Sequence, residues 1–487
     1  MNKPLTRLFV LVLVMFALLV GFTSRWTIFE AGSLRANADN HAPFIESLRV
    51  QRGAILAADG TTILAESLRN HDGTYRRVYP FGKLYAPALG YYDPTYGSFG
   101  LEDYRNSSLA GSPPQQSSII DQLEGKRTNG DDVVTTIDPH AQQVAFQGLA
   151  GRDGAVVAMV PSTGAIKVFA ASPTYDPNLV RTQAGQNALK NSTDAALVDR
   201  AAQGQYAPGS TFKIVTDIAA IDTGKYTQNS VLNGDSPITV SGQPLANDSG
   251  TSYGPVTLSD ALTNSINTVW AQVALGVGAP ALQTYMNRLG FYSKLPIDLP
   301  SSEISESGVR FPGRSGYLPL TSGADVGRVG IGEGGLEVTP LQMVMVAAAV
   351  ANNGRLMVPH LTKSVLNADG QTVETIKPQL YSQVMKPSTA RTVGAMMENV
   401  VKDGTGTQAA LAGVRVAGKT GTAQDCSNLA LIACQYNQDW FIAYAPVNDP
   451  QIAVAVTVSH QLNGFGGTIA APIAKAVIQA LGIGATG

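Results

Sequence analysis

Ser210 and Lys213 are the two residues whose types and spacing point most directly to chemistry. They lie in the stretch Tyr206-Ala-Pro-Gly-Ser-Thr-Phe-Lys-Ile-Val-Thr216, which is typical of a loop that turns into a helix. Residues three apart share one face of a helix, so the lysine amine can reach the serine hydroxyl. A serine needs a positioned base to become a nucleophile, and a lysine whose pKa is lowered by burial can be that base.

The Ser-x-x-Lys pattern is weak by itself, because it arises about once by chance in a chain of 487 residues. The alternative is an N-cap serine followed one turn later by a solvated lysine. Two further motifs, which follow in order along the chain, decide between these interpretations.

Ser265-Ile266-Asn267 is the second motif, and we expect it to be the turn between a helix over 256–264 and an apolar helix that begins at Thr268. A hydroxyl can relay a proton, and a carboxamide can both accept from and donate to a substrate amide. Taken alone, the tripeptide is better explained as an ordinary polar connection between helices.

Lys419-Thr420-Gly421-Thr422 is the third motif and is predicted to lie on a strand at the edge of a cleft. The cation would attract an anionic group, the hydroxyls would bind it, and the glycine would allow close backbone approach. An exposed strand end is the alternative. The three motifs together indicate attack of an activated serine on an acyl group next to a carboxylate.

Composition excludes several other kinds of protein. The net charge is −2 and only 14% of residues are charged, so nothing indicates a nucleic-acid partner. Five scattered histidines and two cysteines form no metal-ligand pattern, and we expect neither a metal nor a cofactor. Lys3 and Arg7 precede an apolar run over 8–22, which predicts a single membrane anchor with its N-terminus in the cytoplasm. A cleaved signal peptide is the alternative.

The predicted elements divide the chain into three parts. The divisions are an anchor over 1–26, a small β-rich module over 27–150 and a catalytic domain over 151–487. Hydrophobic patterning predicts a mixed α/β domain with a mainly antiparallel sheet. The expected elements are a hairpin over 49–65 around Asp59-Gly60, strands over 75–80, 133–137, 154–160, 165–171, 440–445 and 452–459, a helix over 139–149, and loops over 90–102, 107–118 and 172–191.

The three motifs resemble those of penicillin-recognising serine acyl transferases, and the rest of the chain resembles a class B penicillin-binding protein. Its compact N-terminal module and its end at Gly487 look most like actinobacterial members of that class. This resemblance implies a transpeptidase domain of the β-lactamase-like fold behind a pedestal or dimerisation-type module. The further stretches that carry it are Arg52-Gly53-Ala-Ile55, Gly100-Leu-Glu102, 332–342, 351–354 and Trp440-Phe-Ile-Ala-Tyr-Ala-Pro446.

The resemblance implies a peptidoglycan D,D-transpeptidase that cross-links stem peptides through a serine acyl-enzyme and is inhibited by β-lactams. Ser210 would be the nucleophile and Lys213 its base, while Ser265, with Lys419, would pass a proton to the leaving amine. Asn267 would hold the donor peptide.

Thr420 and Thr422, with Gly421 between them, would bind the terminal carboxylate. A D,D-carboxypeptidase side reaction and a SEDS-type membrane glycan polymerase as partner are also implied. Rival interpretations are a β-lactamase or D,D-carboxypeptidase, a penicillin sensor, and a structural protein with a vestigial site.

Two features set this chain apart. It has Asp199-Arg200-Ala201 where the family more often has Asn-Arg-Ala, and Gly332-Glu333-Gly334 where the family more often has Gly-Gln-Gly. Cys426 and Cys434 follow the third motif closely, and outside the cytoplasm two such cysteines suggest a disulfide, with two free thiols as the alternative.

Overall fold

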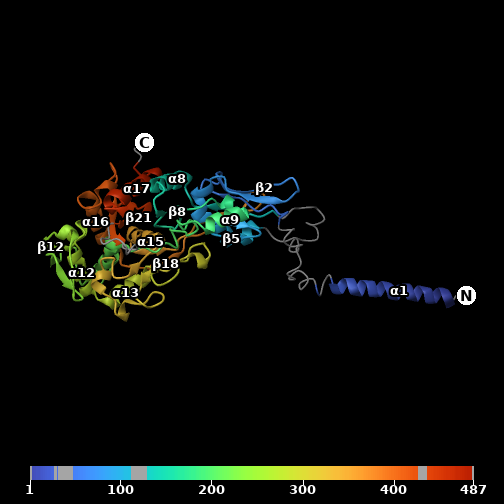
Figure 1. The fold of residues 1–487 in the computed structure, drawn as a ribbon, viewed down its shortest axis with the longest axis horizontal. Coiled ribbons are helices and arrows are strands. Elements are labelled where there is room, and N and C mark those ends of the chain that lie inside the picture. Colours follow the sequence, from blue (N-terminus) through green and yellow to red (C-terminus); the bar gives the residue numbers. More distant parts are fainter. Residues whose placement is uncertain (1–2, 27–29, 31–47, 111–128, 426–435, 485–487) are drawn as a thin grey trace.

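A five-stranded antiparallel sheet forms the centre of the catalytic domain (Figure 1). The structure is a computed structural model that describes residues 3–26, 30, 48–110, 129–425 and 436–484. In their order across the sheet, the strands are β19 (Ala417–Asp425), β20 (Tyr436–Ala445), β21 (Ile452–Leu462), β7 (Gly154–Met159) and β8 (Ile166–Ser172). All four neighbouring pairs are antiparallel, as predicted, so β19 and β8 form the two edges.

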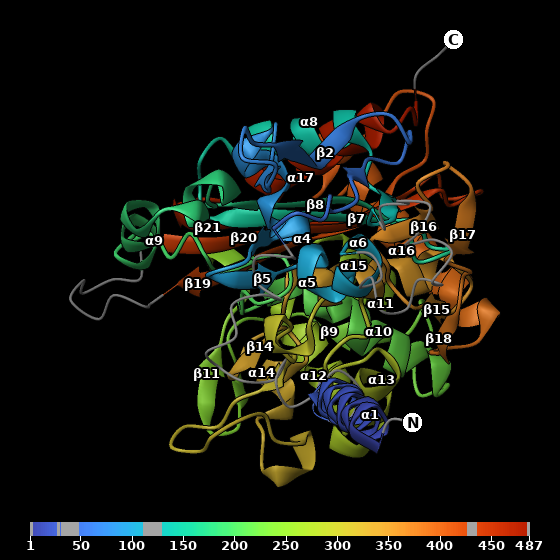
Figure 2. The ribbon, with the colours of Figure 1, turned by 90° about the vertical axis from the view of Figure 1, so that its right-hand side faces the viewer.

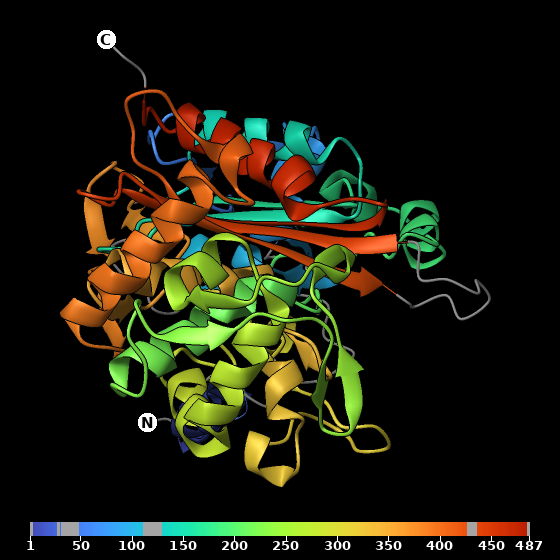
Figure 3. The ribbon, with the colours of Figure 1, turned by 90° about the vertical axis from the view of Figure 1, so that its left-hand side faces the viewer.

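Both faces of this sheet are buried, which explains why β7, Gly154-Ala-Val-Val-Ala-Met159, is apolar throughout rather than alternating. In β7, Val156 and Ala158 join the core under α8 (Pro139–Leu149) and α17 (Gly466–Ala480). Ala155, Val157 and Met159, which alternate with them, join the core on the opposite side, where α15 (Pro340–Ala351) packs. Figures 2 and 3 show α8 and α17 on one side of the sheet, and Figure 2 shows α15 on the other.

The helices on the second side form a lobe that carries two of the three motifs. They are α10 (Lys213–Asp222), α11 (Leu258–Thr263), α12 (Asn267–Val277), α13 (Ala279–Arg288), α14 (Val326–Val329) and α16 (Pro387–Lys402). Short two-stranded sheets accompany these helices. They pair β9 (Val231–Asn233) with β12 (Pro255–Thr257), β10 (Ile238–Val240) with β11 (Gln243–Leu245), β13 (Gly308–Val309) with β14 (Leu336–Glu337), and β15 (Arg355–Met357) with β18 (Leu380–Gln383). This lobe meets the β19 edge of the sheet, where η4 (Gly209–Phe212) contacts β19.

A second, six-stranded sheet builds the N-terminal module. Its order is β17 (Thr372–Thr375), β16 (Thr362–Leu366), β6 (Asp132–Thr135), β1 (Ile55–Leu56), β2 (Ile63–Arg69) and β3 (Tyr75–Val78). The predicted hairpin around Asp59-Gly60 is confirmed, since β1 and β2 pair antiparallel. Strand β16 comes from within the catalytic domain of the sequence. It pairs with β6 and so joins the catalytic domain to the N-terminal module.

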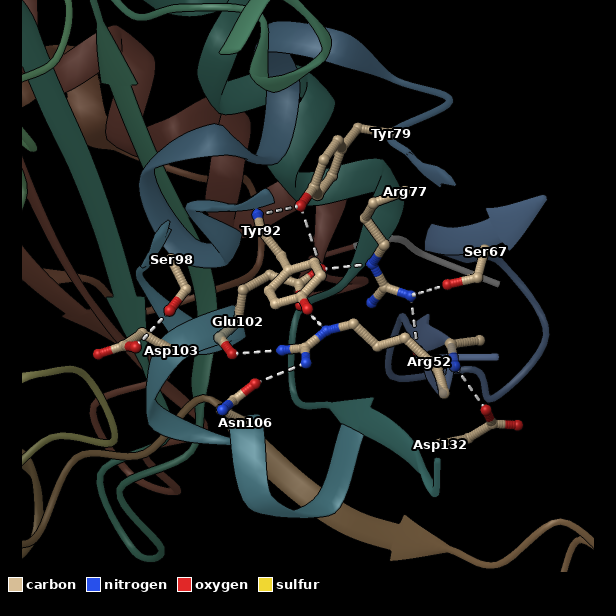
Figure 4. A network of polar contacts seen from close by, with 12 residues as sticks. Arg52, Ser67, Arg77, Tyr79, Tyr92, Ser98, Glu102, Asp103, Asn106 and Asp132 are labelled. Atoms are coloured by element: carbon tan, nitrogen blue, oxygen red, sulfur yellow. Dashed lines mark hydrogen bonds and ion pairs between the residues drawn. The ribbon is translucent and has the colours of Figure 1, made fainter. Parts of the chain in front are cut away.

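Glu102 is the centre of a buried ion network in this module (Figure 4). One carboxylate oxygen accepts from Arg52 Nε at 2.7 Å and the other from Arg77 Nε at 2.6 Å. The Tyr79 hydroxyl lies 3.2 Å from the same carboxylate, and Asn106 accepts from Arg52 at 2.6 Å. Burial opposes the charge of Glu102, but the Arg77 and Arg52 guanidiniums outweigh it and hold its pKa below the ordinary value. The network ties β3, the stretch before β1, and α5 (Leu101–Tyr104) together.

Two segments predicted to be loops contain regular structure. A hairpin of β4 (Tyr91–Asp93) and β5 (Gly97–Phe99) lies within 90–102, because Asp93 accepts two backbone N–H groups and closes the turn. The range 172–191 contains η3 (Pro177–Arg181) and α9 (Gln183–Lys190), which side chains of Asp176 and Thr182 cap. We overlooked these capping residues in the sequence.

The boundaries of two other predictions also differ. Helix α6 (Asn106–Leu109) occupies the start of the predicted loop 107–118, and 111–128 lies outside the described residues. The helix expected over 256–264 begins only at Leu258, since Thr257 caps it and also ends β12. Helices η2 (Gly82–Tyr85) and α4 (Ala86–Leu89) complete the module.

Helix α1 (Lys3–Ser24) is 22 residues long, apolar and without a buried residue, so it is long enough to cross a membrane. The other apolar helix of note, α15, has only 12 residues, and it is a buried core helix.

We expect Glu102→Gln to destabilise the full-length chain by about 3–5 kcal/mol, because two buried guanidinium groups lose their common counter-charge. Glu374→Gln is the matched control. Glu374 pairs with Arg105 at 3.0 Å but is 44% exposed, so its loss costs under about 1 kcal/mol. Thermal unfolding in detergent measures both, and equal small shifts in the two variants would contradict the prediction.

Candidate active site

Ser210 lies on a short 3-10 turn that leads directly into a helix. This turn, η4, is followed at once by α10, whose first residue is Lys213. The predicted change from loop to helix at the first motif is therefore confirmed. Ser210 is partly exposed, whereas Lys213 is fully buried. In the described part of the chain, no hydrogen bond engages the Ser210 hydroxyl, which leaves it open to the cleft.

Three glycines let the surrounding backbone close tightly on this turn. A Cβ on Gly332 would lie 1.9 Å from the carbonyl oxygen of Gly209, and one on Gly421 would lie 2.6 Å from that of Pro208. Gly209 itself has φ +50° and faces the Thr422 carbonyl. Strand β19 and the loop at Gly332 thus hold the nucleophile turn from two sides, and neither contact tolerates a side chain.

The amine of Lys213 contacts only neutral oxygen atoms of the second motif. It lies 2.6 Å from Asn267 Oδ1, 2.7 Å from the Ser265 carbonyl and 3.2 Å from Ser265 Oγ. The Asn267 amide in turn donates to the Ala246 carbonyl at 3.2 Å. The helix lobe therefore positions the first two motifs against each other.

Ser265 Oγ lies between two lysine amines. Lys419 Nζ, from the edge strand β19, is 2.9 Å from Ser265 Oγ and 3.1 Å from the Thr420 carbonyl. Ser265 has φ +58°, in the left-handed region, and it lies between Asn264, the C-cap of α11, and Ile266, the N-cap of α12. The predicted turn is confirmed, and it aims the hydroxyl at both lysines. A strained backbone at such a position is common in functional sites.

The electrostatics of the two lysines favour their neutral forms. Burial lowers the pKa of Lys213 well below its usual range, and repulsion by Lys419 lowers it further. Glu333 and Asp248 act in the opposite direction on Lys213 but do not offset the burial. Burial alone lowers the pKa of Lys419 to about 7. Both amines therefore titrate far below an ordinary lysine.

The two threonines of the third motif are already engaged. Thr420 Oγ1 lies 2.6 Å from Thr405 Oγ1, and Thr422 Oγ1 accepts from the Gly466 N–H at 3.3 Å. We did not predict Thr405 or Gly466 from the sequence. The run Gly404-Thr405-Gly406 just before the third motif was a signal for the first of them, because small residues mark close backbone approach.

The residues that depart from the family pattern differ in their surroundings, and only Glu333 is among the groups that act on Lys213. Glu333 follows Gly332, and its carboxylate lies 3.6 Å from Arg328. Asp199 is buried, which raises its pKa to about 7, and it accepts from the Ala201 N–H at 2.9 Å. Cys426 and Cys434 lie outside the described residues, so the predicted disulfide stays a prediction. Among the described residues, no group of three or more His, Cys, Asp or Glu could hold a metal ion.

A Ser-x-x-Lys helix start, a Ser-x-Asn turn and a Lys-Thr-Gly edge strand meet in one cleft between a helical lobe and an antiparallel sheet. This fold and site define a penicillin-recognising serine transpeptidase. A model of the penicillin-binding protein transpeptidase domain matches residues 154–479, and a model of the penicillin-binding protein A dimerisation domain matches 52–133.

Curated and solved proteins agree with this class. The chain is 35% identical to the peptidoglycan D,D-transpeptidase PbpA of Mycolicibacterium smegmatis and 34% identical to PbpA of Mycobacterium tuberculosis, in each case over 99% of both chains. It also resembles a solved structure of penicillin-binding protein A from M. tuberculosis as its ceftriaxone acyl-enzyme complex. That likeness has a TM-score of 0.81 and 31% identity, and it covers 90% of this chain and 99% of the other.

The chain belongs to the class B penicillin-binding proteins. It is a peptidoglycan D,D-transpeptidase that works through a serine acyl-enzyme.

We expect Gly332→Ala to slow release of D-Ala from a D-Ala-D-Ala peptide by about 10²-fold, because its Cβ would displace the nucleophile turn. Gly313→Ala is the control: Gly313 has φ +73°, close to the φ +89° of Gly332, but a Cβ there meets nothing within 4 Å. Backbone strain therefore affects both variants, while the displacement affects only the first. A comparable loss of rate in both would show that strain, not close approach, is the cause.

Proposed function

We propose that Ser210 is the nucleophile of this transpeptidase and that neutral Lys213 is its general base. The observation that carries this proposal is the placement of Ser265 Oγ between two buried amines, 3.2 Å from Lys213 Nζ and 2.9 Å from Lys419 Nζ. Such a site can accept a proton at one amine and pass one on through the hydroxyl.

The hydrogen bonds of Lys213 fit a neutral amine. An uncharged amine has two N–H donors, and the two shortest contacts, to Asn267 Oδ1 and the Ser265 carbonyl, use both, so the longer contact with Ser265 Oγ at 3.2 Å falls to its lone pair. In this proposal the lone pair turns from Ser265 Oγ to Ser210 when substrate arrives and takes up the Ser210 proton. Because both contacts are with neutral oxygens, no carboxylate bonded to this amine favours its charged form.

In the proposed reaction, Ser210 Oγ bonds to the carbonyl carbon of the penultimate D-Ala while its proton moves to Lys213 Nζ. The C–N bond then breaks, and the leaving D-Ala amine takes a proton from Ser265 Oγ, which Lys419 replaces. An amine of a neighbouring stem peptide then attacks the ester and passes its proton through Ser265 to Lys419, while the ester C–O bond breaks and Lys213 returns its proton to Ser210 Oγ. Water in place of that amine gives a D,D-carboxypeptidase side reaction.

The edge strand provides the binding groups in this proposal. Lys419 attracts the terminal carboxylate, and the hydroxyls of Thr420 and Thr422 hold it, with Gly421 leaving room for the turn. The backbone N–H groups of Ser210 and Thr422 form the oxyanion hole. Asn267 retains one amide N–H for the donor peptide, since its other contacts are with Lys213 and Ala246.

We propose that β-lactams acylate Ser210. One relative with the same fold, penicillin-binding protein A from M. tuberculosis, forms acyl-enzyme complexes with ceftriaxone, imipenem and penicillin G, which supports this assignment. A β-lactam carboxylate would take the same place on β19 as the D-Ala carboxylate.

The proposal extends to the arrangement at the membrane. Helix α1 would anchor the chain with its first residues in the cytoplasm, which is the orientation that Lys3 and Arg7 favour. The module over 27–150 would space the catalytic domain over 151–487 from the membrane. It would also contact a SEDS-type membrane polymerase, which supplies the glycan strands that this chain cross-links.

We expect Ser210→Ala to abolish covalent labelling of the full-length chain by a fluorescent penicillin. Ser388→Ala, an exposed serine on α16, is expected to label like the wild type. Labelled protein followed over time separates the two enzyme classes. A label that forms and then disappears quickly would indicate a hydrolase, and a label that persists in Ser210→Ala would exclude Ser210 as the nucleophile.

The efficiency of acylation should pass through a maximum with pH. It should rise from acid pH as Lys213 loses its proton, and fall above about pH 7 as Lys419 loses the charge that attracts a carboxylate. In Lys419→Arg the charge persists, so the alkaline fall should disappear. Lys402→Arg, a change on the surface of α16, should leave the profile unchanged. An alkaline fall that survives in Lys419→Arg would contradict the assignment.

A further inference from the structure

A cavity of about 280 Å³ lies far from the active site, where the N-terminal module meets the catalytic sheet. It opens beside β8, the edge of the sheet opposite β19, and beside β16 of the six-stranded sheet; both strands are labelled in Figure 2. Its lining comes from three regions of the chain: Ala58 and Thr136 of the module, Thr163, Ala165 and Lys167 around β8, and His360, Lys363, Thr375, Ile376 and Pro378 around β16 and β17.

The charged residues that line this cavity, Lys167 and Lys363, are both basic. Three threonines and His360, whose pKa is lowered by burial, also line it, and no carboxylate is among its lining residues. Lys363 Nζ uses one of its N–H groups on the Ala58 carbonyl at 3.1 Å. In the described part of the chain, the Lys167 amine makes neither a hydrogen bond nor an ion pair. At least five N–H groups of the two lysines therefore remain free for a ligand.

The carboxylates that act on these cations already have other partners. Asp138 accepts from the Ala141 N–H at 2.9 Å as the N-cap of α8. Asp298 accepts from the backbone N–H groups of Leu361 and Thr362 at 2.5 and 2.6 Å. Lys167 is only partly exposed, and its burial and the repulsion from Lys363 both disfavour its charge. A bound anion would supply a counter-charge and so favour the charged form of Lys167.

We propose that this cavity is a binding site for a compact phosphate-bearing anion. Two flexible ammonium groups suit the several oxygen atoms of a phosphate, and hydroxyls such as that of Thr375 can complete its shell. The volume admits a diphosphate or a small phosphate ester. Such a ligand would join β8 of the catalytic sheet to β16 and to the hairpin at Ala58, so it would fix the module against the catalytic domain.

The test uses the full-length chain in neutral detergent, with inorganic diphosphate as the probe. We expect saturable binding by calorimetry and a rise in melting temperature. Lys167→Gln and Lys363→Gln should each weaken binding by about tenfold or more, since each removes a charge-assisted contact. Lys167→Arg should retain it. Lys377→Gln is the matched control, because Lys377 lies between two lining residues but does not itself line the cavity.

A second arm identifies the source of the phosphate. Phosphatidylglycerol is added to the same micelles, with and without diphosphate. Lysine-dependent binding of the lipid that diphosphate displaces would assign the site to a membrane headgroup, and binding of diphosphate alone would assign it to a soluble anion. Either result supports the site. Absence of saturable binding in both arms, or equal affinity in wild type and Lys167→Gln, would overturn the proposal. Unliganded melting temperatures show whether each variant is folded.

Discussion

Two lysine amines buried around one serine hydroxyl are the constraint on which the site depends. Taking an ammonium group out of water is unfavourable unless a counter-charge accompanies it, and here the amines meet neutral oxygens instead. The result is a lowered pKa for both Lys213 and Lys419. The fold has to supply the stability that this arrangement costs. It does so with a sheet buried on both faces and an apolar helix, α15, packed beneath it.

The position of β19 at the edge of the sheet explains how the three motifs meet. An edge strand can line a cleft along its free side, and β19 uses that side to face the turn at Ser210 and the connection at Ser265. The approach is close enough that Gly421 and Gly332 have no room for a side chain. The distance between the Ser210 turn and β19 is thus set by backbone contact rather than by flexible side chains, which favours a preorganised site.

Local patterns predicted much of this structure. The three motifs, the hairpin at Asp59 and the strands of the central sheet follow from residue types and periodicity, which short segments carry in full. Two further features depend on contacts distant in sequence. The pairing of β16 with β6 joins segments more than two hundred residues apart. Thr405 reaches Thr420 only because α16 ends against β19. Neither position has a local signature strong enough to indicate its partner.

Glu102, Asp217 and Lys213 are buried ionisable side chains, and the partners of each one determine whether its charged or its neutral form is favoured. Glu102 is matched by two guanidinium groups, so its charge is stable and holds a module together. Asp217 is equally buried, but no hydrogen-bond partner for its carboxylate is found among the described residues, and burial raises its pKa well above the usual range, which favours its neutral form. Lys213 differs from both, because its amine contacts Ser265, which is partly exposed. Burial alone therefore does not distinguish these three groups. A buried amine beside a partly exposed hydroxyl, with two neutral acceptors for its two N–H groups, is the arrangement that the proposed general base requires.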